Sequence, residues 1–567
     1  MGFGSFLLSA GTAASLLVRA TASPSISPSP TTPAGAAPPV NPAFAGFAFE
    51  AKSFLFYAGP NGTANTFSQN LVQAIANKTQ TQPIIRVGGT SLDHSLGYDA
   101  NQIEPIVVPP SQQSAGIPTN MTFGPSYFDI FEYFPDARYI FDIPFAYEHL
   151  SSSLIIAQAA YAAIEPENIL ALELGNEVNL YSGNTRSSDW TASDYVSQWT
   201  EWTDDIEARL KLTNTTKIWQ AAAVSAETTN SLLSSPATVD GQWDIRDLFN
   251  DANLVQDQAR IKSVSVHYYQ TKIDDTTSLQ NDLMNHAAIK TGSAQIADAA
   301  GFLNELEPQP IPLVLGEVGS SLGNGSNDSP LQAVLGAALS QVDFMLHSMS
   351  VGVGWINYQS GVSFTFSLWS VDYSSPDGTS NKTNEVLAPF YAHVFAAEFI
   401  RSSLGKSTSN TTVTEVNVTG TGVQSDFLSA YAAYEDDRLA KIAVLNLQYW
   451  DGKLTNVSNS NCTDLTSSRP AETFTIAVPD DVKSVQKKTL TSPCGATAYA
   501  NENITWGGVS WNTKENDGIG RQVLTEDESV QVIQVTNGTL QVSVTASEAA
   551  MLYLQYESTN WGCHPLA

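Results

Sequence analysis

Two glutamates stand at the ends of two apolar runs in the sequence. Glu177 ends the run 169–177, and Glu317 ends the run 311–317, about 140 positions further along the chain. Both runs have the composition of strands buried on both faces, so each carboxyl would lie where a strand meets solvent. In a (β/α)8 barrel, both carboxyls would lie at the C-terminal mouth, where such barrels hold their active sites. Two facing carboxyls are the minimum that hydrolysis of a glycosidic bond requires.

The run that leads to Glu177 contains two further polar side chains. Because strand side chains alternate between faces, Glu173 lies on the same face as Glu177 but deeper. A buried carboxylate needs a partner, and Arg86, in another apolar run, is a candidate for a structural ion pair with Glu173. Asn176 directly precedes Glu177 and can donate an amide hydrogen bond to a sugar hydroxyl.

The elements that must position these residues alternate between strand and helix. Eight short apolar runs between Ala43 and Tyr358 are separated by segments with helical periodicity, which predicts an α/β fold, a (β/α)8 TIM barrel. Helical spacing is clear at 193–211 and 329–350, and 385–404 is expected to form the closing helix. The eight expected strands are 43–50, 83–89, 138–144, 169–177, 217–224, 262–268, 312–317 and 353–358.

After about residue 405 the pattern changes to short alternating runs separated by Gly, Asn and Ser turns, which predicts a C-terminal antiparallel β-sandwich. The expected strands are 412–418, 427–434, 439–447, 473–478, 482–490, 531–535 and 551–556. We therefore divide the chain into a signal peptide (1–22), a Pro/Ser/Thr-rich leader with no core of its own (23–40), a catalytic barrel (41–404) and a sandwich domain (405–567).

The N-terminus resembles a secretory signal. The apolar run 6–18 is too short for a good membrane span, and Ala20-Thr-Ala22 has the form of a cleavage site, although the segment before the run lacks Lys and Arg. No later stretch reaches 18 uninterrupted apolar residues, so no membrane association is expected. Asn-x-Ser/Thr sites, which predict surface N-glycans, support secretion. They begin at Asn61, Asn77, Asn120, Asn214, Asn324, Asn327, Asn381, Asn410, Asn417, Asn456, Asn461, Asn503 and Asn537.

The charge balance is acidic. The chain has 56 Asp and Glu against 26 Lys and Arg, a net charge of −30, although only 14% of its residues are charged. Nucleic acids, anionic membranes and heavily sulfated polymers are therefore disfavoured as partners, because their approach would be repulsive. The simplest interpretation of this charge is a soluble protein suited to acidic surroundings.

The cysteines do not indicate a metal site. Cys462, Cys494 and Cys563 all lie near the C-terminus, and no CxxC or Cys/His spacing typical of a metal site is present. One disulfide is expected in an oxidising compartment, with Cys462–Cys494 as the preferred pair and one thiol left over. Neither a metal nor an organic cofactor is implied.

An Asn-Glu pair at the end of the fourth strand, with a second Glu ending the seventh, resembles the large clan of retaining (β/α)8 glycosidases. Within this clan, the segment Glu-Leu-Gly-Asn-Glu at 173–177 is similar to glycoside hydrolase family 79, the β-glucuronidases and heparanases. Segments 44–50, 86–93 and 267–269 match the same family in order, and the barrel-plus-sandwich layout agrees. The resemblance covers roughly residues 41–560.

This resemblance implies that Glu177 is the general acid/base and Glu317 the nucleophile. A retaining enzyme needs carboxyls about 5–5.5 Å apart, one protonated and the other ionised. We expect the ionised Glu317 to raise the pKa of Glu177, and a hydrogen bond from Tyr269 or Tyr268 to keep Glu317 ionised.

Other residues at the expected strand ends are weaker candidates for substrate contacts. Glu50 could accept from sugar hydroxyls or be a solvated rim charge, and Asp93 could bind a hydroxyl or cap a helix. His267 fits a wall histidine better than a direct ligand. Tyr358 ends the eighth run and could reach the sugar, whereas Trp369 could stack on a ring or belong to the core.

The residues that would bind a uronic carboxylate are not evident, because no basic cluster stands at the expected strand ends. Arg86 is expected to be committed to Glu173, and Lys52 is only a candidate. The Gly/Ser-rich loop 319–325 could aim backbone N–H groups at an anion. Family members are thought to use such donors with tyrosine hydroxyls, but Leu322 stands where a tyrosine is expected.

Four functions fit these observations. The leading one is a retaining exo-β-glucuronidase that removes terminal glucuronic acid, with or without a 4-O-methyl group, from glycans or glycoconjugates. A heparanase-like endo-β-glucuronidase would need a Lys/Arg-lined cleft, which the net charge of −30 disfavours. The others are a β-glycosidase for a neutral sugar and a non-catalytic carbohydrate-binding cell-wall glycoprotein, although a binding protein would not need both glutamates.

Overall fold

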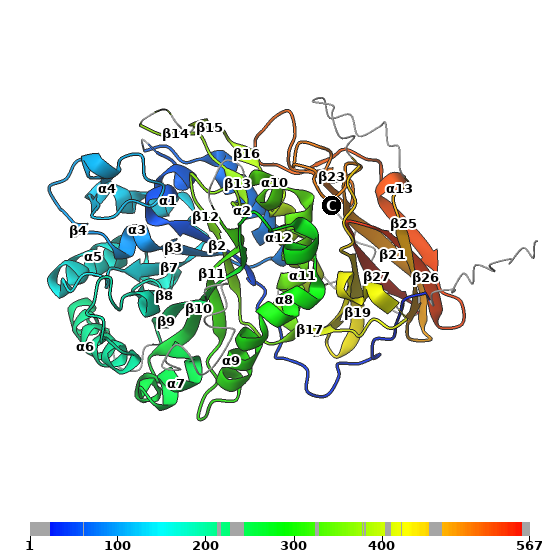
Figure 1. Ribbon diagram of the computed structural model, residues 1–567, viewed down its shortest axis with the longest axis horizontal. Helices are drawn as coiled ribbons and strands as arrows, with labels where there is room; N and C mark the ends of the chain where they lie inside the picture. The colour runs from blue at the N-terminus through cyan, green and yellow to red at the C-terminus, as the bar shows by residue number, and fades with distance from the viewer. Residues whose placement is uncertain are drawn as a thin grey trace, which may run out of the picture.

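Parallel strands from the first two thirds of the chain close into a barrel, on the left of Figure 1. The strands pair in chain order, and the last pairs with the first. The predicted (β/α)8 barrel is confirmed, and each expected strand overlaps an observed one. The barrel strands are β2 (Ala45–Glu50), β3 (Ile84–Gly88), β7 (Arg138–Ile143), β8 (Ile169–Leu174), β9 (Trp219–Ala226), β10 (Ile261–Lys272), β11 (Leu313–Leu322) and β12 (Ile356–Ser360).

The structure, a computed structural model, describes residues 23–60, 62–212, 217–226, 243–323, 328–376, 378, 381–402, 410–420, 422–452 and 468–557. The expected signal peptide lies outside these residues, as do the sites at Asn61, Asn214, Asn324, Asn327, Asn456 and Asn461. Across the described residues, no helix combines the length and apolar character needed to cross a membrane.

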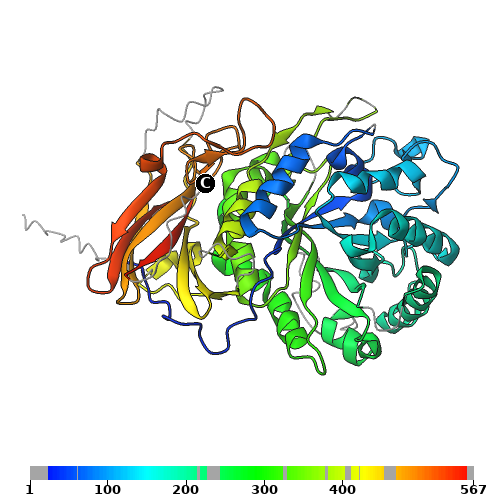
Figure 2. The same cartoon turned by 180° about the vertical axis from the view of Figure 1, so that it is seen from behind.

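Helices surround the barrel, as Figures 1 and 2 show from opposite sides. They are α1 (Ala51–Ala58), α2 (Thr66–Thr79), α3 (Thr90–Asp93), α4 (Pro125–Phe128), α5 (Leu150–Ala163), α6 (Ala192–Leu210), α7 (Ile245–Asn250), α8 (His286–Gly292), α9 (Ala294–Asn304), α10 (Ser329–Gln332), α11 (Leu335–Ser350) and α12 (Phe390–Ile400). The expected helix at 193–211 is α6, which begins at a capping box formed by Thr191 and Asp194. The closing helix α12 starts later than expected, because 385–386 form a short strand.

Two loops at the C-terminal ends of the barrel strands carry small sheets of their own. The loop after β3 contains β4 (Gly97–Tyr98), β5 (Ile106–Val107) and β6 (Thr122–Phe123). The loop after β12 contains β13 (Trp369–Ser370), β14 (Tyr373–Ser374), β15 (Asn381–Lys382) and β16 (Glu385–Val386). The two loops touch, because a Cβ on Gly116 would lie 2.2 Å from Ser363 Oγ.

The barrel interior is layered from apolar to polar. A small apolar cluster comprises Ile84, Ile140, Leu170, Ala171, Val314 and Trp355, which lie towards the N-terminal ends of their strands. One step further along β3 and β8, the inward-facing residues become Arg86 and Glu173, both completely buried. The polar layer that contains Arg86 and Glu173 therefore lies between the apolar cluster and the C-terminal mouth of the barrel.

The second domain is built on a sheet of nine antiparallel strands that is buried on both faces. Along β27 (Glu548–Tyr556), Ala549, Met551 and Tyr553 pack into the core shared with the barrel helices, whereas the alternate residues Ala550 and Leu552 pack into a separate core. The other strands are β17 (Thr411–Glu415), β18 (Leu428–Glu435), β19 (Arg438–Asn446), β21 (Val482–Thr491), β22 (Thr505–Trp506), β23 (Val509–Ser510), β24 (Arg521–Gln522) and β25 (Val530–Gln534).

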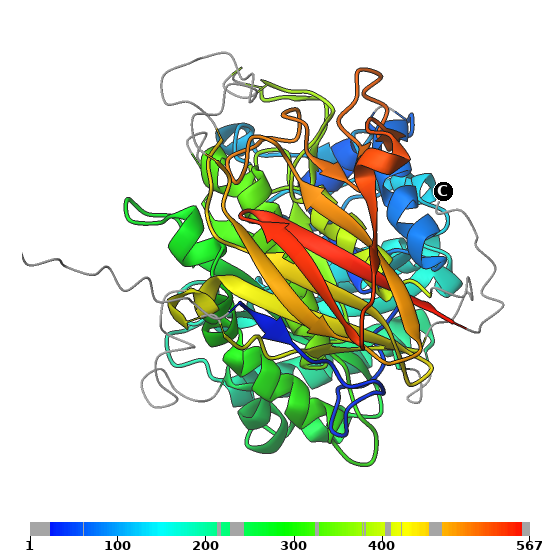
Figure 3. The same ribbon diagram turned by 90° about the vertical axis from the view of Figure 1, so that its right-hand side faces the viewer.

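A three-stranded sheet covers the outer face of this domain. It contains β20 (Ala471–Ala477), β26 (Thr539–Thr545) and β1 (Ser25–Ile26), which comes from the Pro/Ser/Thr-rich segment. β1 pairs in parallel with β20, and the side chain of Ile26 is buried in the outer core. Figure 3 shows this blue N-terminal strand lying on the C-terminal domain. The leader has no core of its own, but it completes the core of another domain.

Cys494 is buried and disulfide-bonded. The two cysteines with which it could pair, Cys462 and Cys563, lie outside the described residues, so the Cys462–Cys494 pairing stays a prediction.

A buried carboxylate joins the barrel to the second domain. Glu398 of α12 accepts from Lys78 of α2 at 2.8 Å and from Lys488 of β21 at 3.0 Å. Trp506 Nε1 and the Tyr553 hydroxyl donate to the same carboxyl at 2.8 and 2.6 Å. Burial alone would raise the pKa of Glu398, but the two lysines hold it well below its usual range. The carboxyl is therefore ionised and fully partnered within the domain junction.

A second polar cluster at this junction contains a charged histidine. His286 of α8 lies 2.9 Å from Asp343 of α11 and 3.2 Å from Glu415 of β17, which also contacts His347 at 3.2 Å. Burial alone would lower the pKa of His286, but the charge and hydrogen bond of Asp343 and the contact with Glu415 raise it to about 10. The same contacts lower the pKa of Asp343 and of Glu415, although burial would raise both.

We predict that His286→Gln lowers the melting temperature, with the largest loss at mildly acidic pH. A raised pKa in the folded state stabilises the protein below the unfolded value of about 6.5, and this contribution disappears as pH rises through about 10. Thermal unfolding at pH 6 should show a loss of roughly 3–6 °C, and the loss should shrink by pH 9.5. The exposed His149→Gln provides the control, and a loss that does not change with pH would contradict this account.

Candidate active site

Arg86 lies on β3, is completely buried, and binds three side chains near the barrel mouth. Its Nε and Nη2 donate to Glu173 Oε1 at 2.9 and 2.7 Å, which confirms the expected ion pair. The guanidinium also donates to Asn176 Oδ1 at 2.8 Å and to Glu317 Oε2 at 3.0 Å. Although burial alone would lower the pKa of Arg86, the charges of Glu173 and Glu317 raise it, so Arg86 is a permanent cation.

Glu317 lies on β11 with both carboxylate oxygens partnered. Besides the Arg86 contact at Oε2, its Oε1 accepts a 2.6 Å hydrogen bond from the hydroxyl of Tyr269 on β10. This bond resolves the open choice between the two tyrosines in favour of Tyr269. Only 11% of the Glu317 side chain is exposed. Two strong donors therefore fix the orientation of this nearly buried carboxyl, as a nucleophile requires.

Glu177 follows β8 in a left-handed backbone conformation, with φ of 53° and ψ of 48°. A residue other than glycine rarely adopts this conformation, and its strain is a feature of functional sites. The turn directs the carboxyl towards His267 of β10, whose Nδ1 lies 3.4 Å from Glu177 Oε1. The Glu177 side chain is 23% exposed, so it is the more accessible of the two candidate catalytic carboxyls.

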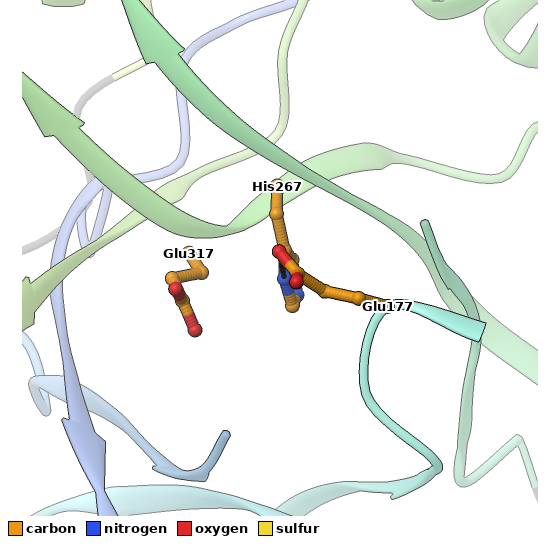
Figure 4. A group of neighbouring side chains, drawn as sticks. All are labelled: Glu177, His267 and Glu317. Carbon is orange, nitrogen blue, oxygen red and sulfur yellow. Dashed lines mark hydrogen bonds and ion pairs between the residues drawn. The ribbon is translucent and has the colours of Figure 1, made fainter. Parts of the chain in front are cut away.

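The two carboxyls face one another across the mouth of the barrel. One oxygen of each glutamate and a ring nitrogen of His267 all lie within 4.8 Å of one another. Figure 4 shows Glu177 reaching to His267, with Glu317 beside them. Carboxyls that operate a double displacement are about 5–5.5 Å apart, whereas an inverting pair leaves about 6.5–9.5 Å for a water molecule. The observed spacing fits the retaining geometry.

The expectation that Glu317 raises the pKa of Glu177 is wrong for this structure. Burial alone would raise it, but the hydrogen bond and charge of His267, with a hydrogen bond from Ser225, hold the pKa of Glu177 below its usual value. The physical reason is that His267 and Ser225 stabilise the ionised form of Glu177 directly, and the charge of Arg86 acts in the same direction. Glu177 is therefore ionised in the free protein and must acquire a proton before it can act as an acid.

Glu50, at the end of β2, is a buried carboxyl rather than a solvated rim charge. Its Oε2 accepts from the backbone N–H of Ser91 at 3.1 Å and from the Ser91 hydroxyl. Burial, followed by the charge of Glu317, raises the pKa of Glu50 to about 7. Gly89, at φ 84°, accommodates this carboxyl, because a Cβ there would lie 2.4 Å from Glu50 Oε1. Glu50 thus lies close enough to Glu317 to sense its charge.

Asn176 and Asp93 are both buried, but the structure gives them different surroundings. Asn176 accepts from Arg86 through its side-chain oxygen, so its amide nitrogen is the group left to donate, 3.5 Å from Thr90 Oγ1. Asp93 neither caps a helix nor faces solvent. Its Oδ1 accepts from the backbone N–H groups of Phe145 and Ala146 at 2.8 and 3.0 Å.

The remaining oxygen of Asp93 accepts from the Tyr181 hydroxyl at 2.6 Å. Burial raises the pKa of Asp93. Its carboxyl fixes the loop after β7 through Phe145 and Ala146 and links that loop to Tyr181. We therefore correct the expected sugar contact of Asp93, because its carboxyl supports the loop instead.

The structure also corrects the expected contacts of Tyr268 and Tyr358. Tyr268 alternates with the inward-facing Tyr269, so its ring points out of the barrel and stacks on Phe344 of α11 at 5.2 Å. Tyr358 packs edge-on against His393 of α12, also outside the barrel, with ring centroids 5.7 Å apart. Both rings belong to the layer between strands and helices, which sequence spacing alone could not distinguish from the interior.

Trp369 belongs to the core. Its ring is completely buried against Phe47 and Phe49, and its Nε1 donates to Ser68 Oγ at 3.0 Å. It is therefore not a stacking platform for a sugar.

Several inward-facing polar residues had no distinctive sequence signal. Gln220 of β9 donates to Glu173 Oε2 at 2.5 Å and so fixes the carboxylate that holds Arg86. Asp142 of β7 is completely buried, and burial, followed by the charge of Asp93, raises its pKa well above the usual range. Each of these residues is a single polar position in an apolar run. Such a position indicates that the side chain is interior, but it does not show which residue is its partner.

Lys52 does not offer its ammonium group to the mouth of the barrel. Its Nζ donates to the backbone oxygen of Ala115 at 2.5 Å and lies 5.8 Å from the ring centre of Tyr373. The side chain therefore fastens the loop after β3. Residues 324–327, in the Gly/Ser-rich segment after Glu317, lie outside the described residues, so the carboxylate-binding role expected of that segment stays a prediction.

Together the (β/α)8 fold and the two facing carboxyls indicate a glycoside hydrolase. Residues 430–551 match the model of the glycosyl hydrolase family 79 C-terminal beta domain. A β-glucuronidase of Neurospora crassa is 30% identical over 521 residues, which cover 85% of this chain and 86% of that protein. A β-glucuronidase of Aspergillus niger is 27% identical over 551 residues, which cover 94% of each chain. The chain belongs to glycoside hydrolase family 79.

Solved structures share the same fold. A 4-O-α-L-rhamnosyl-β-D-glucuronidase of Fusarium oxysporum superposes with a TM-score of 0.72 at 21% identity, over 94% of this chain and 100% of that chain. A family 51 arabinofuranosidase of Xanthomonas axonopodis superposes with a TM-score of 0.57 at 14% identity, over 94% of this chain and 99% of that chain. These likenesses support the arrangement of a barrel with an attached β domain.

We predict that Tyr269→Phe lowers kcat/KM at least about tenfold, whereas Tyr268→Phe changes it less than about twofold. The first substitution removes a 2.6 Å hydrogen bond to the Glu317 carboxylate, worth roughly 1.5–3 kcal/mol, and the second alters a hydroxyl outside the barrel. Steady-state kinetics of the two variants on one aryl glycoside would measure the difference. Equal losses in both variants would contradict the assignment of Tyr269 to Glu317.

We also predict that Glu50 makes the protein more stable at pH 4.5 than at pH 7.5. Its pKa is raised to about 7 in the folded state, so its contribution is complete below the unfolded value of 4.5 and is lost as pH rises through 7. The loss should be on the order of 3 kcal/mol, and Glu50→Gln should remove this part of the pH dependence. Urea unfolding at both pH values measures it, and an unchanged pH dependence in Glu50→Gln would refute the role of this carboxyl.

Proposed function

We propose that this protein is a retaining, exo-acting β-glucuronidase that releases terminal β-linked glucuronic acid from glycans or glycoconjugates. The observation that carries the proposal is the close approach of Glu177 and Glu317, whose oxygens lie within 4.8 Å at the mouth of a family 79 barrel. The relatives from Neurospora crassa and Aspergillus niger are named β-glucuronidases, which supports glucuronic acid as the sugar that is released.

In the first step, the Glu317 carboxylate attacks the anomeric carbon and forms a glycosyl ester, while Glu177 protonates the leaving oxygen. Tyr269 and Arg86 hold the Glu317 carboxyl in position until the bond forms. Because Glu177 is ionised in the free protein, its proton must come from a neighbour or from solvent. His267, 3.4 Å away, is placed to deliver it.

In the second step, Glu177 takes a proton from a water molecule that attacks the same anomeric carbon. The ester bond between that carbon and Glu317 breaks, and Glu317 leaves as a free carboxylate. Two inversions at one carbon leave the β configuration unchanged. Arg86 loses one of its anionic partners when the ester forms but keeps Glu173, so the guanidinium stays in place for the next cycle.

The surroundings of the two carboxyls favour a small sugar unit. The loops after β3 and β12 follow the C-terminal ends of their strands and touch at Gly116 and Ser363, a contact that supports exo action. The amide nitrogen of Asn176 and the buried carboxyl of Glu50 face the same region and are proposed to bind sugar hydroxyls. An endo-acting enzyme for sulfated chains is disfavoured, because a net charge of −30 would repel that substrate.

We further propose that the protein is secreted and N-glycosylated. Support comes from the signal-like N-terminus and from exposed Asn-x-Ser/Thr sites on the described surface. The exposed asparagines are Asn77, Asn381, Asn410, Asn417, Asn503 and Asn537, whereas Asn120 is partly exposed.

The deciding experiment compares p-nitrophenyl β-D-glucuronide with the β-D-glucoside at mildly acidic pH, using the wild-type protein, Glu317→Gln and Glu177→Ala. The wild type should prefer the glucuronide, and NMR should show the β anomer as the first product. Glu317→Gln should abolish turnover with little loss of sugar binding. Glu177→Ala should fail on poor leaving groups but retain part of its activity on aryl glycosides, which need no protonation.

Preference for the glucoside would identify a β-glycosidase for a neutral sugar and overturn the glucuronidase proposal. An α product released first would refute the retaining mechanism. Full activity of Glu317→Gln would remove Glu317 from the reaction, and equal losses of Glu177→Ala on both kinds of leaving group would remove its acid role.

A further inference from the structure

Glu177, His267 and Glu317 have the ligand set of a transition-metal site. Two carboxylates and one imidazole offer atoms that lie within 4.8 Å of one another. His267 and Glu317 come from β10 and β11, and Glu177 comes from the turn after β8 (Figure 4). The His267 side chain has no exposed surface, and its Nε2 has no hydrogen-bond partner among the described residues. The nitrogen that faces Glu177 is Nδ1, so this atom would bind the metal, and burial already confines the imidazole in the site.

The spacing suits a tetrahedral ion. Zn²⁺ binds imidazole nitrogen and carboxylate oxygen at about 2.0–2.2 Å, so two ligand atoms of a tetrahedron are about 3.4 Å apart. The measured separation of His267 Nδ1 and Glu177 Oε1 is 3.4 Å. The Glu317 oxygen lies within 4.8 Å of both atoms, so a shift of at most about 1.4 Å would bring it to the same spacing. Glu177 is 23% exposed, so solvent can supply a water as the fourth ligand.

The overall charge of the protein also favours a cation, because a net charge of −30 raises the concentration of cations near it. A mixed set of one nitrogen and two oxygens favours Zn²⁺ over Mg²⁺, which prefers six oxygen ligands in an octahedron.

We propose that Zn²⁺ binds reversibly to Glu177, His267 and Glu317, and that it inhibits hydrolysis because it occupies both catalytic carboxyls. The binding part stands on the geometry alone, whereas the inhibition rests on the proposed function. Substrate and Zn²⁺ would therefore compete for the same site, and the activity would fall as the concentration of free Zn²⁺ rises.

Binding is tested first, without reference to catalysis. Titration of the whole protein with ZnCl2 in a calorimeter, and the visible absorption of a Co²⁺ complex, report affinity and coordination geometry. His267→Gln and Glu177→Gln should each weaken binding roughly tenfold or more, because each removes one ligand. His149→Gln, at an exposed site, is the matched control and should bind as the wild type does.

His347→Gln distinguishes the other histidine–carboxylate cluster, at the domain junction, where His347 lies 3.2 Å from Glu415. Loss of binding in His347→Gln but not in His267→Gln or Glu177→Gln would place the metal at the junction and overturn the proposal. Absence of saturable Zn²⁺ binding, or equal binding of Mg²⁺, would also overturn it.

Inhibition is tested second, with p-nitrophenyl β-D-glucuronide. Zn²⁺ should raise the apparent KM without changing kcat, and EDTA should restore full activity, whereas MgCl2 should have no effect. Zn²⁺ that binds without inhibiting would show that the metal leaves the carboxyls free, and would refute this half of the proposal. A wild-type protein that binds Zn²⁺ but hydrolyses no glucuronide would instead refute the proposed function.

Discussion

A single buried guanidinium organises the inside of this barrel. Arg86 has no solvent exposure and donates to Glu173, Glu317 and Asn176, which come from two different strands and the turn after one of them. An arginine taken out of water is stable only if its charge and its donors are matched in a good geometry. The barrel must therefore bring these acceptors to fixed positions, and their positions in turn define where a sugar can bind.

This constraint extends to residues that perform no chemistry. Gln220 fixes the far oxygen of Glu173, and Gly88 leaves room for the guanidinium, because a Cβ there would lie 3.0 Å from Arg86 Cζ. One cation cannot balance all the acids that face it, so some of them stay protonated. Burial raises the pKa of Glu50 to about 7 and that of Asp142 well above its usual range. Burial therefore sets the direction of the pKa shift for Glu50 and Asp142, and the charge of Arg86 offsets it only in part.

The sequence predicted the barrel well because all eight parallel strands are buried on both faces and read as continuous apolar runs. It placed Glu177 and Glu317 at strand ends for the same reason. The sequence could not show which of two adjacent tyrosines faces inward. Side chains of a strand alternate between its two faces, but the alternation alone does not show which face is the interior. A difference of one position separates Tyr269, which binds Glu317, from Tyr268, which packs on α11.

Other features depend on contacts between distant segments, which a local pattern does not contain. Asp93 looked like a candidate ligand for a sugar, yet its partners lie more than fifty positions away in the loop after β7. The run 539–545, which forms β26, has the alternating pattern of a strand and is absent from the strands predicted above. The pairing of β1 with β20 had no local signal, because two residues in a proline-rich segment do not show a period.

That pairing has a consequence for how the molecule is put together. Ser25 pairs with Thr475, so the second domain is built from both ends of the chain, and the barrel is inserted between its strands. Closing a loop of this length costs conformational entropy that local contacts do not repay, so β1 is expected to join late in folding. A C-terminal fragment cut at the apparent domain boundary would lack this strand, and the place of Ile26 in its outer core would be empty. The second domain therefore cannot complete its outer core without the N-terminal strand β1, so we expect the two domains to depend on each other in folding.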